Sequence, residues 1–379
     1  MIVLVAVQDV GGANALTPVI HQLRARQVEV VTLACGKALS VVQSAGIPHQ
    51  ALSLSELAES RMRSDLSQLL TTINPDILLL GTAWGLSLDK EILAVNQTCD
   101  RPRPTVSLID MWSNYRTRFT HPLSGELVLP TQIALMDAIA YEQAIAEGLP
   151  LTHLIVTGQP YLEQLPLLLQ KASVVDQAAA LRKTWLSESP TNSSIVLFAS
   201  EAFSRDFPPH SPYYRGYTEI TALQGLIQAV ELEEQRSHRP WVIVDKLHPE
   251  ESLAFVRAAL SASQRQIHIL EHQPPLPCIL AADLIVGMTS MFLVESAFCG
   301  QPTLSFQPDT LNPQDFIGSR IGVVPAATSI AALSTWLSRQ QIACQRQKPS
   351  GSPTDLPSFQ HRGATTRVID VLLKLIHSA

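Results

Sequence analysis

Short, uninterrupted apolar runs separated by amphipathic stretches recur along this chain. Ile2–Val7 is the first such run, and it leads through a polar, glycine-containing turn into a helical pattern over Ala13–Arg26. Runs of this kind are typical of strands that are buried on both faces, as in parallel sheets covered by helices. Strands that alternate with helices predict right-handed crossover connections and an α/β fold.

The predicted strands fall into two series, separated by a polar, helical stretch over Leu165–Ser194. The chain of 379 residues is also longer than one hydrophobic core comfortably serves. We therefore predict two Rossmann-like domains facing a central cleft, with residues 1–170 in the first domain and 171–379 in the second. The later strands are predicted over Val28–Leu33, Asp76–Leu80, Thr105–Ile109, Ile133–Met136, Leu154–Val156, Ile195–Ala199, Trp241–Val244, Ile267–Leu270, Leu284–Val286 and Thr303–Phe306.

The last 40 or so residues do not continue the alternation of predicted strands and helices. Gln340–Ser358 is polar and contains several prolines, which predicts a loop. Ala364–His377 has the pattern of an amphipathic terminal helix.

Composition argues against several classes of function. The net charge of −6 and pI of about 6.0 do not suit the basic surface that nucleic-acid binding requires, so we expect no nucleic-acid partner. The five cysteines are odd in number and form no Cys-x-x-Cys pair, so we expect reduced thiols, no zinc site and a cytoplasmic protein. No apolar run approaches the ~20 residues of a spanning helix, which leaves only peripheral membrane association open.

The first candidate binding segment is the turn Asp9-Val10-Gly11-Gly12 after the first strand. Gly11 and Gly12 allow a sharp turn and a close approach of a ligand to the start of the following helix, where free N–H groups favour an anion. The full G-x-G-x-x-G spacing is absent, so a dinucleotide site is not indicated. A tight turn capped by Asp9 is the alternative interpretation.

The second candidate segment follows the strand Trp241–Val244. Lys246 and His248 lie where open α/β sheets bind ligands, beyond the carboxyl end of a strand. Pro249 suits the first position of a helix, which we predict over Glu250–Ser261 and which would place His248 just before its start. We expect Lys246 and His248 to contact a phosphate, with a helix-capping histidine as the alternative.

The third candidate segment begins where the strand Leu284–Val286 ends. Thr289 and Ser290 open a helix and can donate hydrogen bonds to a phosphate, while Glu295 lies about one and a half turns further on and can accept from ribose hydroxyls. An ordinary helix cap and a solvated glutamate are the alternatives. Ser200, at the end of the first strand of the second series, is also predicted on the nucleotide side, or else in a plain loop.

The first domain offers residues for an acceptor. Trp84, Trp112 and Tyr115 follow predicted strands and have aromatic rings that can stack on a sugar, unless they are packed in the core. Asp110 and Asp9 also follow strands, and either could act as general base on an acceptor hydroxyl. We prefer Asp110 because aromatic and hydroxyl-bearing residues surround it.

The segment Ala282–Pro302, which reads ADLIVGMTSMFLVESAFCGQP, resembles the carboxy-terminal half of GT-B-type glycosyltransferases and of UDP-N-acetylglucosamine 2-epimerases. His248-Pro249 and Thr289-Ser290 are similar to elements that bacterial sialyl- and polysialyltransferases and glycerophosphotransferases place around the nucleotide and phosphate. The resemblance covers the two-half plan and implies that the terminal helix packs back on the first domain. Asp9-Val10-Gly11-Gly12 departs from the Gly-Thr-Arg-Pro-Glu type motif of the epimerases, and the acidic motif of the sialyl families is missing from the first half.

With this resemblance, the candidate residues lead us to expect a metal-independent glycosyltransferase of polysaccharide or glycoconjugate biosynthesis. Its substrates would be a nucleotide-sugar donor and a glycan, lipid or small-molecule acceptor, and it would use no cofactor. A nucleotide-sugar 2-epimerase is one alternative, and a non-catalytic nucleotide- or sugar-binding protein is another. The sequence does not specify the donor, the acceptor, the stereochemistry or the oligomeric state.

Overall fold

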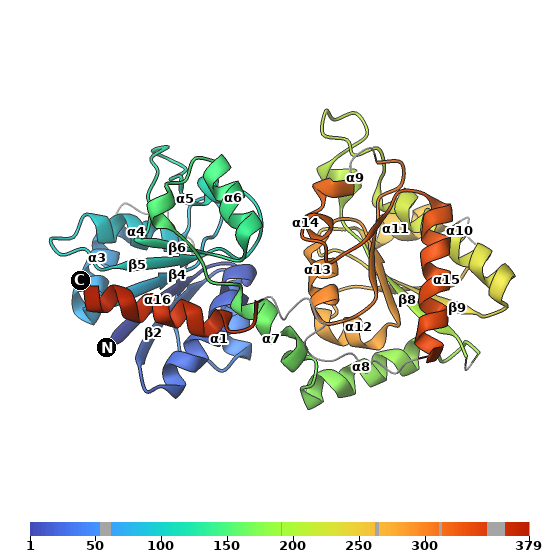
Figure 1. The fold of residues 1–379 in the computed structure, drawn as a ribbon, viewed down its shortest axis with the longest axis horizontal. Helices are drawn as coiled ribbons and strands as arrows, with labels where there is room; N and C mark the ends of the chain where they lie inside the picture. The colour runs from blue at the N-terminus through green and yellow to red at the C-terminus, as the bar shows by residue number, and fades with distance from the viewer. Residues whose placement is uncertain (54–61, 191, 262–264, 311–312, 347–360, 379) are drawn as a thin grey trace. The chain divides into compact units, whose positions relative to one another are not determined.

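The computed structural model describes residues 1–53, 62–190, 192–261, 265–310, 313–346 and 361–378 (Figure 1). The chain divides into two compact units: unit 1 comprises Met1–Gln164 and Gln360–Ala379, and unit 2 comprises Leu165–Phe359. Each unit is a parallel sheet flanked by helices, so the predicted class of two Rossmann-like α/β halves is confirmed.

Unit 1 is built around a seven-stranded sheet with the order β3-β2-β1-β4-β5-β6-β7, in which every neighbouring pair is parallel. Its elements are β1 (Ile2–Val7), α1 (Val10–Ala25), β2 (Glu29–Cys35), α2 (Ala38–Ser44), β3 (Gln50–Leu52), α3 (Met62–Ile73), β4 (Ile77–Leu80), α4 (Leu88–Gln97), β5 (Thr105–Leu108), α5 (Tyr115–Phe119), β6 (Gln132–Leu135), α6 (Ala138–Ala146), the 3₁₀ turn η2 (Leu151–His153), β7 (Leu154–Val156), α7 (Pro160–Leu168) at the boundary, and α16 (Ala364–Ser378).

Unit 2 contains a six-stranded parallel sheet with the order β10-β9-β8-β11-β12-β13. Its elements are α8 (Ala172–Trp185), β8 (Ser194–Ala199), α9 (Phe203–Asp206), α10 (Glu219–Ser237), β9 (Trp241–Lys246), α11 (Leu253–Leu260), β10 (Ile267–Leu270), α12 (Pro275–Ala281), β11 (Leu284–Gly287), α13 (Met291–Phe298), β12 (Thr303–Phe306), the 3₁₀ turn η3 (Pro313–Asp315), α14 (Ile317–Arg320), β13 (Ala326–Ala327) and α15 (Ile330–Arg346).

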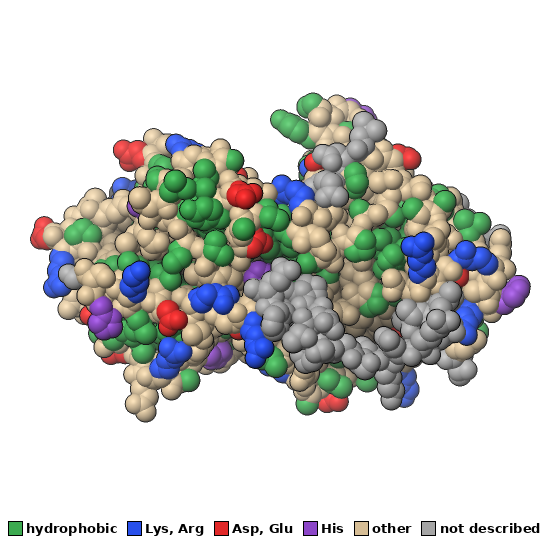
Figure 2. Space-filling view, viewed as in Figure 1, with side chains coloured by type: hydrophobic (Ala, Val, Ile, Leu, Met, Phe, Trp, Pro, Cys, Tyr) green, Lys and Arg blue, Asp and Glu red, His purple; other side chains and the backbone are tan. Residues whose placement is uncertain are grey.

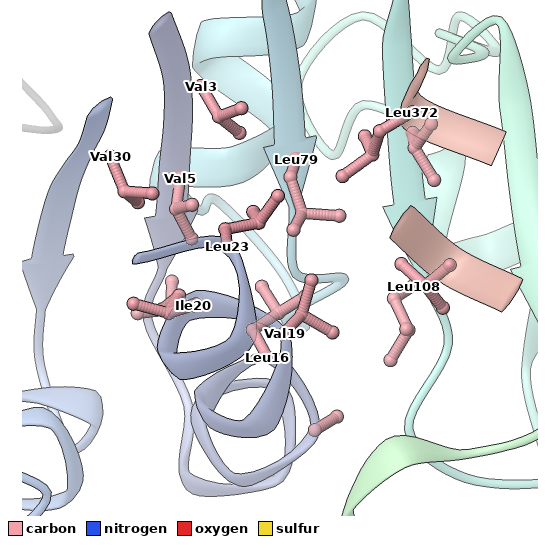
Figure 3. Close-up of a cluster of buried hydrophobic side chains, with 14 of the residues drawn as sticks. Val3, Val5, Leu16, Val19, Ile20, Leu23, Val30, Leu79, Leu108 and Leu372 are labelled. Atoms are coloured by element: carbon pink, nitrogen blue, oxygen red, sulfur yellow. The ribbon is translucent and has the colours of Figure 1, made fainter. Parts of the chain in front are cut away.

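The core of unit 1 forms where α1 packs on the sheet. Leu16, Ile20 and Leu23 recur at helical spacing on one face of α1, are fully buried, and point toward Val5 and Leu79 of the sheet (Figure 3). Burying side chains of this size stabilises a fold by roughly 1.5–3 kcal/mol each relative to leaving them exposed. The spacing of apolar residues in the sequence therefore determines which face of α1 meets the sheet.

Helix α16 completes this core although it lies at the far end of the sequence. Leu372 is fully buried in the same cluster as the α1 side chains. The carboxylate of Glu163 in α7 accepts hydrogen bonds from the backbone N–H of Gly363, at 2.5 Å, and of Thr365, at 3.0 Å. The carboxylate thus satisfies N–H groups that the start of a helix leaves unpaired. The terminal helix thus packs on unit 1, as the resemblance implied, although the predicted boundaries counted its residues with the second domain.

Two parts of the sequence-based assignment need correction. The prediction missed the edge strands β3 and β13, which have only three and two residues and leave too short a pattern to recognise. The loop predicted over Gln340–Ser358 is wrong at its start, because α15 continues to Arg346; residues 347–360 lie outside the described part of the chain.

Figure 2 shows that, on one face, the described Lys and Arg side chains are scattered among acidic, polar and apolar ones. A surface that follows a phosphate backbone instead gathers its basic side chains in a tract. Within the described residues, none of the helices is both long enough and apolar enough to cross a bilayer.

Replacing Leu372 by alanine tests the place of α16 in the core of unit 1. Removing a fully buried leucine side chain leaves a cavity, so Leu372→Ala should lower the free energy of unfolding by about 2–5 kcal/mol in urea titrations. Lys374→Ala, on the exposed side of the same helix, should change it by less than about 0.5 kcal/mol. Equal effects of the two substitutions would show that α16 is not part of the core.

Candidate functional site

Each sheet has one position at which successive strands are added on opposite sides. In unit 2 this position lies between β8 and β11, and in unit 1 it lies between β1 and β4. The loops that leave the carboxyl ends of such a pair diverge, and the crevice between them is where open α/β sheets bind ligands. The residues after these four strands and after their neighbours β5 and β9 therefore define one candidate site in each unit.

In unit 2, the carboxylate of Glu201 lies against Thr289, which comes just before the start of α13. Glu201, which follows β8, accepts hydrogen bonds from the backbone N–H of Thr289 at 2.6 Å and from the Thr289 hydroxyl at 3.1 Å. Burial raises the pKa of Glu201 to about 7, although the hydrogen bonds from Thr289 and Ser290 act in the opposite direction. The position predicted for a phosphate therefore holds a buried carboxyl group whose pKa is raised toward neutral pH.

Helix α13 begins where the sequence predicted, but its N-cap is Ser290 and not Thr289, the residue named for the ordinary-cap alternative. Ser290 is the N-cap residue, and its hydroxyl accepts a hydrogen bond from the backbone N–H of Phe292 at 3.1 Å. Thr289 lies one residue earlier, and Glu295 is partly buried within the helix. Because Ser290 caps the helix, the Thr289 N–H and hydroxyl lie just outside it, and both donate to Glu201.

The carboxyl end of β9 comes close to the start of α13, as the prediction of one shared edge requires. The Lys246 ammonium lies over the Phe292 ring, 5.5 Å from its centroid. Behind it, the hydroxyl of Ser200 donates to the Glu251 carboxylate at 2.7 Å, and burial raises the pKa of Glu251. Ser200 and Lys246 thus lie at the same edge of the sheet as Glu201 and Thr289; that they bind a nucleotide stays a prediction.

The structure corrects the surroundings of His248. Residues 248–251 form a turn, and α11 begins only at Leu253 with Ser252 as its N-cap, so Pro249 does not open a helix. The backbone N–H of His248 donates to Glu251 at 2.5 Å, and its exposed imidazole accepts from the N–H of Glu250 at 3.3 Å. Burial of part of the ring lowers the pKa of His248, so its neutral form is favoured.

In unit 1, carboxylates also occupy the start of α1. Asp9 is its N-cap and accepts from the backbone N–H of Gly12 at 2.7 Å. A Cβ atom on Gly11 would lie 1.8 Å from Oδ2 of Asp110, so only glycine leaves room for that carboxylate. Gly11 and Gly12 thus accommodate the protein's own acidic side chains, and Asp9 has the capping role that was the alternative interpretation.

A buried arginine holds Asp110 in place. Arg118 donates to Oδ1 of Asp110 at 2.9 Å and to the carbonyl and hydroxyl oxygens of Thr82 at 2.8 and 3.1 Å. Burial raises the pKa of Asp110, although the Arg118 charge lowers it; the neighbouring Asp9 charge raises it further. Arg118 was missed by the sequence analysis, because nothing in the pattern of α5 marks it as buried.

Asp89 is a third carboxyl group of this site that the sequence analysis missed. Its Oδ2 accepts from the backbone N–H of Ala83 at 2.8 Å, while its buried Oδ1 has no hydrogen-bond partner among the described residues. Burial, followed by the charge of Asp9, raises the pKa of Asp89 to about 6. An acid with this pKa can take up or release a proton near neutral pH.

The three aromatic residues predicted to bind an acceptor sugar differ in how far they are buried. Trp84 is exposed, with 52% of its surface accessible, on the loop that also carries Ala83. Trp112 is buried and donates from its ring nitrogen to Asp137 at 2.7 Å, and Tyr115 is buried with its hydroxyl 3.0 Å from Gln143. Trp112 and Tyr115 therefore pack the interior and do not offer a ring face to a sugar.

Among the described residues, no group of three or more His, Cys, Asp or Glu is arranged to hold a metal ion.

Comparison with solved structures identifies the class of fold. The UDP-GlcNAc 2-epimerase from Neisseria meningitidis, solved with UDP-GlcNAc, is similar over 99% of this chain and 100% of its own, with a TM-score of 0.67 and 16% identity. The UDP-GlcNAc 2-epimerase from Methanocaldococcus jannaschii matches over 99% of both chains, with a TM-score of 0.66 and 12% identity. An Anabaena protein solved with UDP and glucose matches over 100% of this chain and 99% of its own, with a TM-score of 0.58 and 15% identity.

The chain therefore has the GT-B-like fold that its sequence suggested, the fold of the UDP-GlcNAc 2-epimerases. No protein-family model matches the chain, and no curated protein matches it in sequence.

Arg118 provides a test of the site in unit 1. Its side chain is 1% exposed, and removing it would leave Asp110 and the Thr82 carbonyl buried without their donor. Arg118→Ala should therefore lower the free energy of unfolding by about 3–5 kcal/mol, measured in urea. The exposed Arg116, two residues away, is the matched control, and Arg116→Ala should cost less than about 1 kcal/mol. A similar cost for both substitutions would contradict a buried ion pair at Asp110.

Proposed function

We propose that this protein is an enzyme that binds a UDP-linked sugar through unit 2 and inverts the configuration of the sugar at C2. The observation that carries the proposal is the set of groups at the β8–β11 switch. Thr289 and Ser290 supply donors, Lys246 supplies a positive charge, and Glu295 lies further along α13 as an acceptor for ribose hydroxyls. The full-length likeness to UDP-GlcNAc 2-epimerases supports this reading over that of a glycosyltransferase.

The carboxyl groups of unit 1 suit the chemistry of such a reaction. Inverting C2 requires that a proton leave one face of the sugar ring and return to the other, so the reaction needs acid–base groups. Asp89 and Asp110 both have pKa values raised by burial, and both interact with the charge of Asp9. Asp89 is the better candidate for proton transfer, because Asp110 is already bound to Arg118.

A glycosyltransferase is the second candidate function. The exposed ring of Trp84 beside the carboxyl groups of unit 1 favours it, because exposed aromatic rings stack on acceptor sugars. The similar Anabaena structure contains UDP and glucose. This reading requires an acceptor molecule, whereas an epimerase converts its nucleotide sugar alone, so the two candidates can be separated experimentally.

Binding of UDP-GlcNAc can be measured by calorimetry. The wild-type protein should bind it, and His248→Ala and Glu295→Ala should each weaken binding about 10- to 100-fold, because a charge-assisted hydrogen bond contributes roughly 1.5–3 kcal/mol. The exposed His272, in the loop after β10, provides the control, and His272→Ala should bind like wild type. If both site variants bound UDP-GlcNAc with wild-type affinity, His248 and Glu295 would not contact the nucleotide.

Incubation with UDP-GlcNAc in D₂O, without an acceptor, tests the reaction. An epimerase should introduce deuterium at C2, which proton NMR detects, whereas a glycosyltransferase should leave C2 unlabelled. Asp89→Asn should slow deuterium incorporation at least ~100-fold while UDP-GlcNAc still binds, because proton transfer by a positioned side chain contributes ~10²–10⁴-fold. Asp100→Asn, at an exposed position, should incorporate deuterium at the wild-type rate. Absence of labelling in the wild-type protein would exclude the epimerase reading.

A further inference from the structure

The nucleotide site proposed in unit 2 already contains an anion that belongs to the protein. Both carboxylate oxygens of Glu201 face Thr289: one accepts from its backbone N–H at 2.6 Å and the other accepts from its hydroxyl at 3.1 Å. These are the donors that a phosphate group would use at this edge of the sheet. A bound phosphate and an ionised Glu201 would therefore compete for the same two hydrogen bonds.

Lys246 supplies a positive charge at this edge, but it acts on Glu251, and Glu201 has further acidic neighbours. From the loop after β9, Glu251 adds another acidic group, and its proximity raises the pKa of Glu201 further. From the segment before α10, the buried Tyr217 interacts electrostatically with Glu201, and from the end of β9 the Lys246 charge acts on Glu251. Behind them, Asp245 of β9 is fully buried, and neither of its carboxyl oxygens has a hydrogen-bond partner among the described residues.

Two negative charges within hydrogen-bonding distance repel each other strongly where solvent is excluded. A neutral Glu201 removes this repulsion and gains an O–H group, which can donate to a phosphate oxygen. A carboxyl group with a pKa of about 7 loses little free energy on protonation at neutral pH, so this change is accessible without unfolding the site.

We propose that Glu201 couples ligand binding to proton uptake: the diphosphate of the nucleotide takes the Thr289 donors, and Glu201 binds one proton and donates a hydrogen bond to the phosphate. The inference rests on the proposed function, since it needs a diphosphate in unit 2. It makes the affinity for the nucleotide depend on pH.

The direction of the pH dependence follows from the raised pKa. Below pH ~6 Glu201 is already protonated in the free protein. Ligand binding therefore takes up almost no further protons, and the affinity for the ligand is highest. Above the pKa of about 7, Glu201 must take one proton from solution for each ligand bound, so the affinity should fall about tenfold per pH unit. The diphosphate of UDP-GlcNAc is a diester and does not titrate in this range, so the ligand itself does not produce the effect.

Calorimetry with UDP-GlcNAc at pH 6 and pH 8, in HEPES-type and Tris-type buffers of different ionisation enthalpy, measures the protons taken up. The wild-type protein should take up close to one proton at pH 8 and close to none at pH 6. Glu201→Gln, which imitates the protonated carboxyl group, should take up none at pH 8 and bind about tenfold more tightly than wild type there. Glu250→Gln, at the exposed neighbour that pairs with Arg205, should behave like wild type.

Glu251 and His248 also lie near this edge and could bind a proton, so Glu251→Gln and His248→Gln separate their contributions from that of Glu201. Retained uptake in Glu251→Gln and His248→Gln, with lost uptake in Glu201→Gln, would support the inference. Binding by wild type without proton uptake at pH 8, or uptake that persists in Glu201→Gln, would overturn it and leave the proposed function intact. Failure of UDP-GlcNAc to bind the wild-type protein at either pH would overturn both proposals. The wild-type measurement decides the matter even if Glu201→Gln does not fold.

Discussion

The parallel pairing of β1 with β4 and of β8 with β11 is the constraint on which the rest of this structure depends. In each sheet the chain begins in the middle, adds strands to one side, and then returns to add strands to the other. All carboxyl ends therefore meet at one edge, and the loops after the two central strands separate there. Side chains that are distant in sequence, such as Glu201 and Thr289, are brought into hydrogen-bonding contact only because their strands are neighbours.

The same constraint explains why acidic side chains collect at these edges. Helices that follow parallel strands begin at the edge and direct unpaired N–H groups toward it. In unit 1 Asp9 satisfies such a group at α1, and in unit 2 Glu201 occupies the donors just before α13. Both sites therefore contain the protein's own carboxylates, and burial raises the pKa values of Asp110 and Glu201 there.

The sequence was sufficient to predict what depends on local pattern. The buried strands were recognised because short continuous apolar runs are typical of strands covered on both faces. The start of α13 was recognised at Thr289 and Ser290 because hydroxyl-bearing residues cap helices. Burial of charged residues could not be foreseen. The run Asp89-Lys90-Glu91 looks like the solvated first turn of a helix, yet all three residues are buried. Trp112 and Tyr115 were equally ambiguous, since an aromatic residue after a strand suits a core as well as a binding surface.

The place of α16 has a consequence for the order in which the protein is completed during synthesis. The ribosome makes residues 1–164 first, but the core around α1 stays open until residues 360–379 have emerged. Unit 2 consists of one continuous segment between these parts, so it can fold while unit 1 still exposes the apolar surface that Leu372 will cover. The first part of the chain to be made is thus the last to be finished, and a chaperone that shields apolar surface would act on unit 1 during that interval.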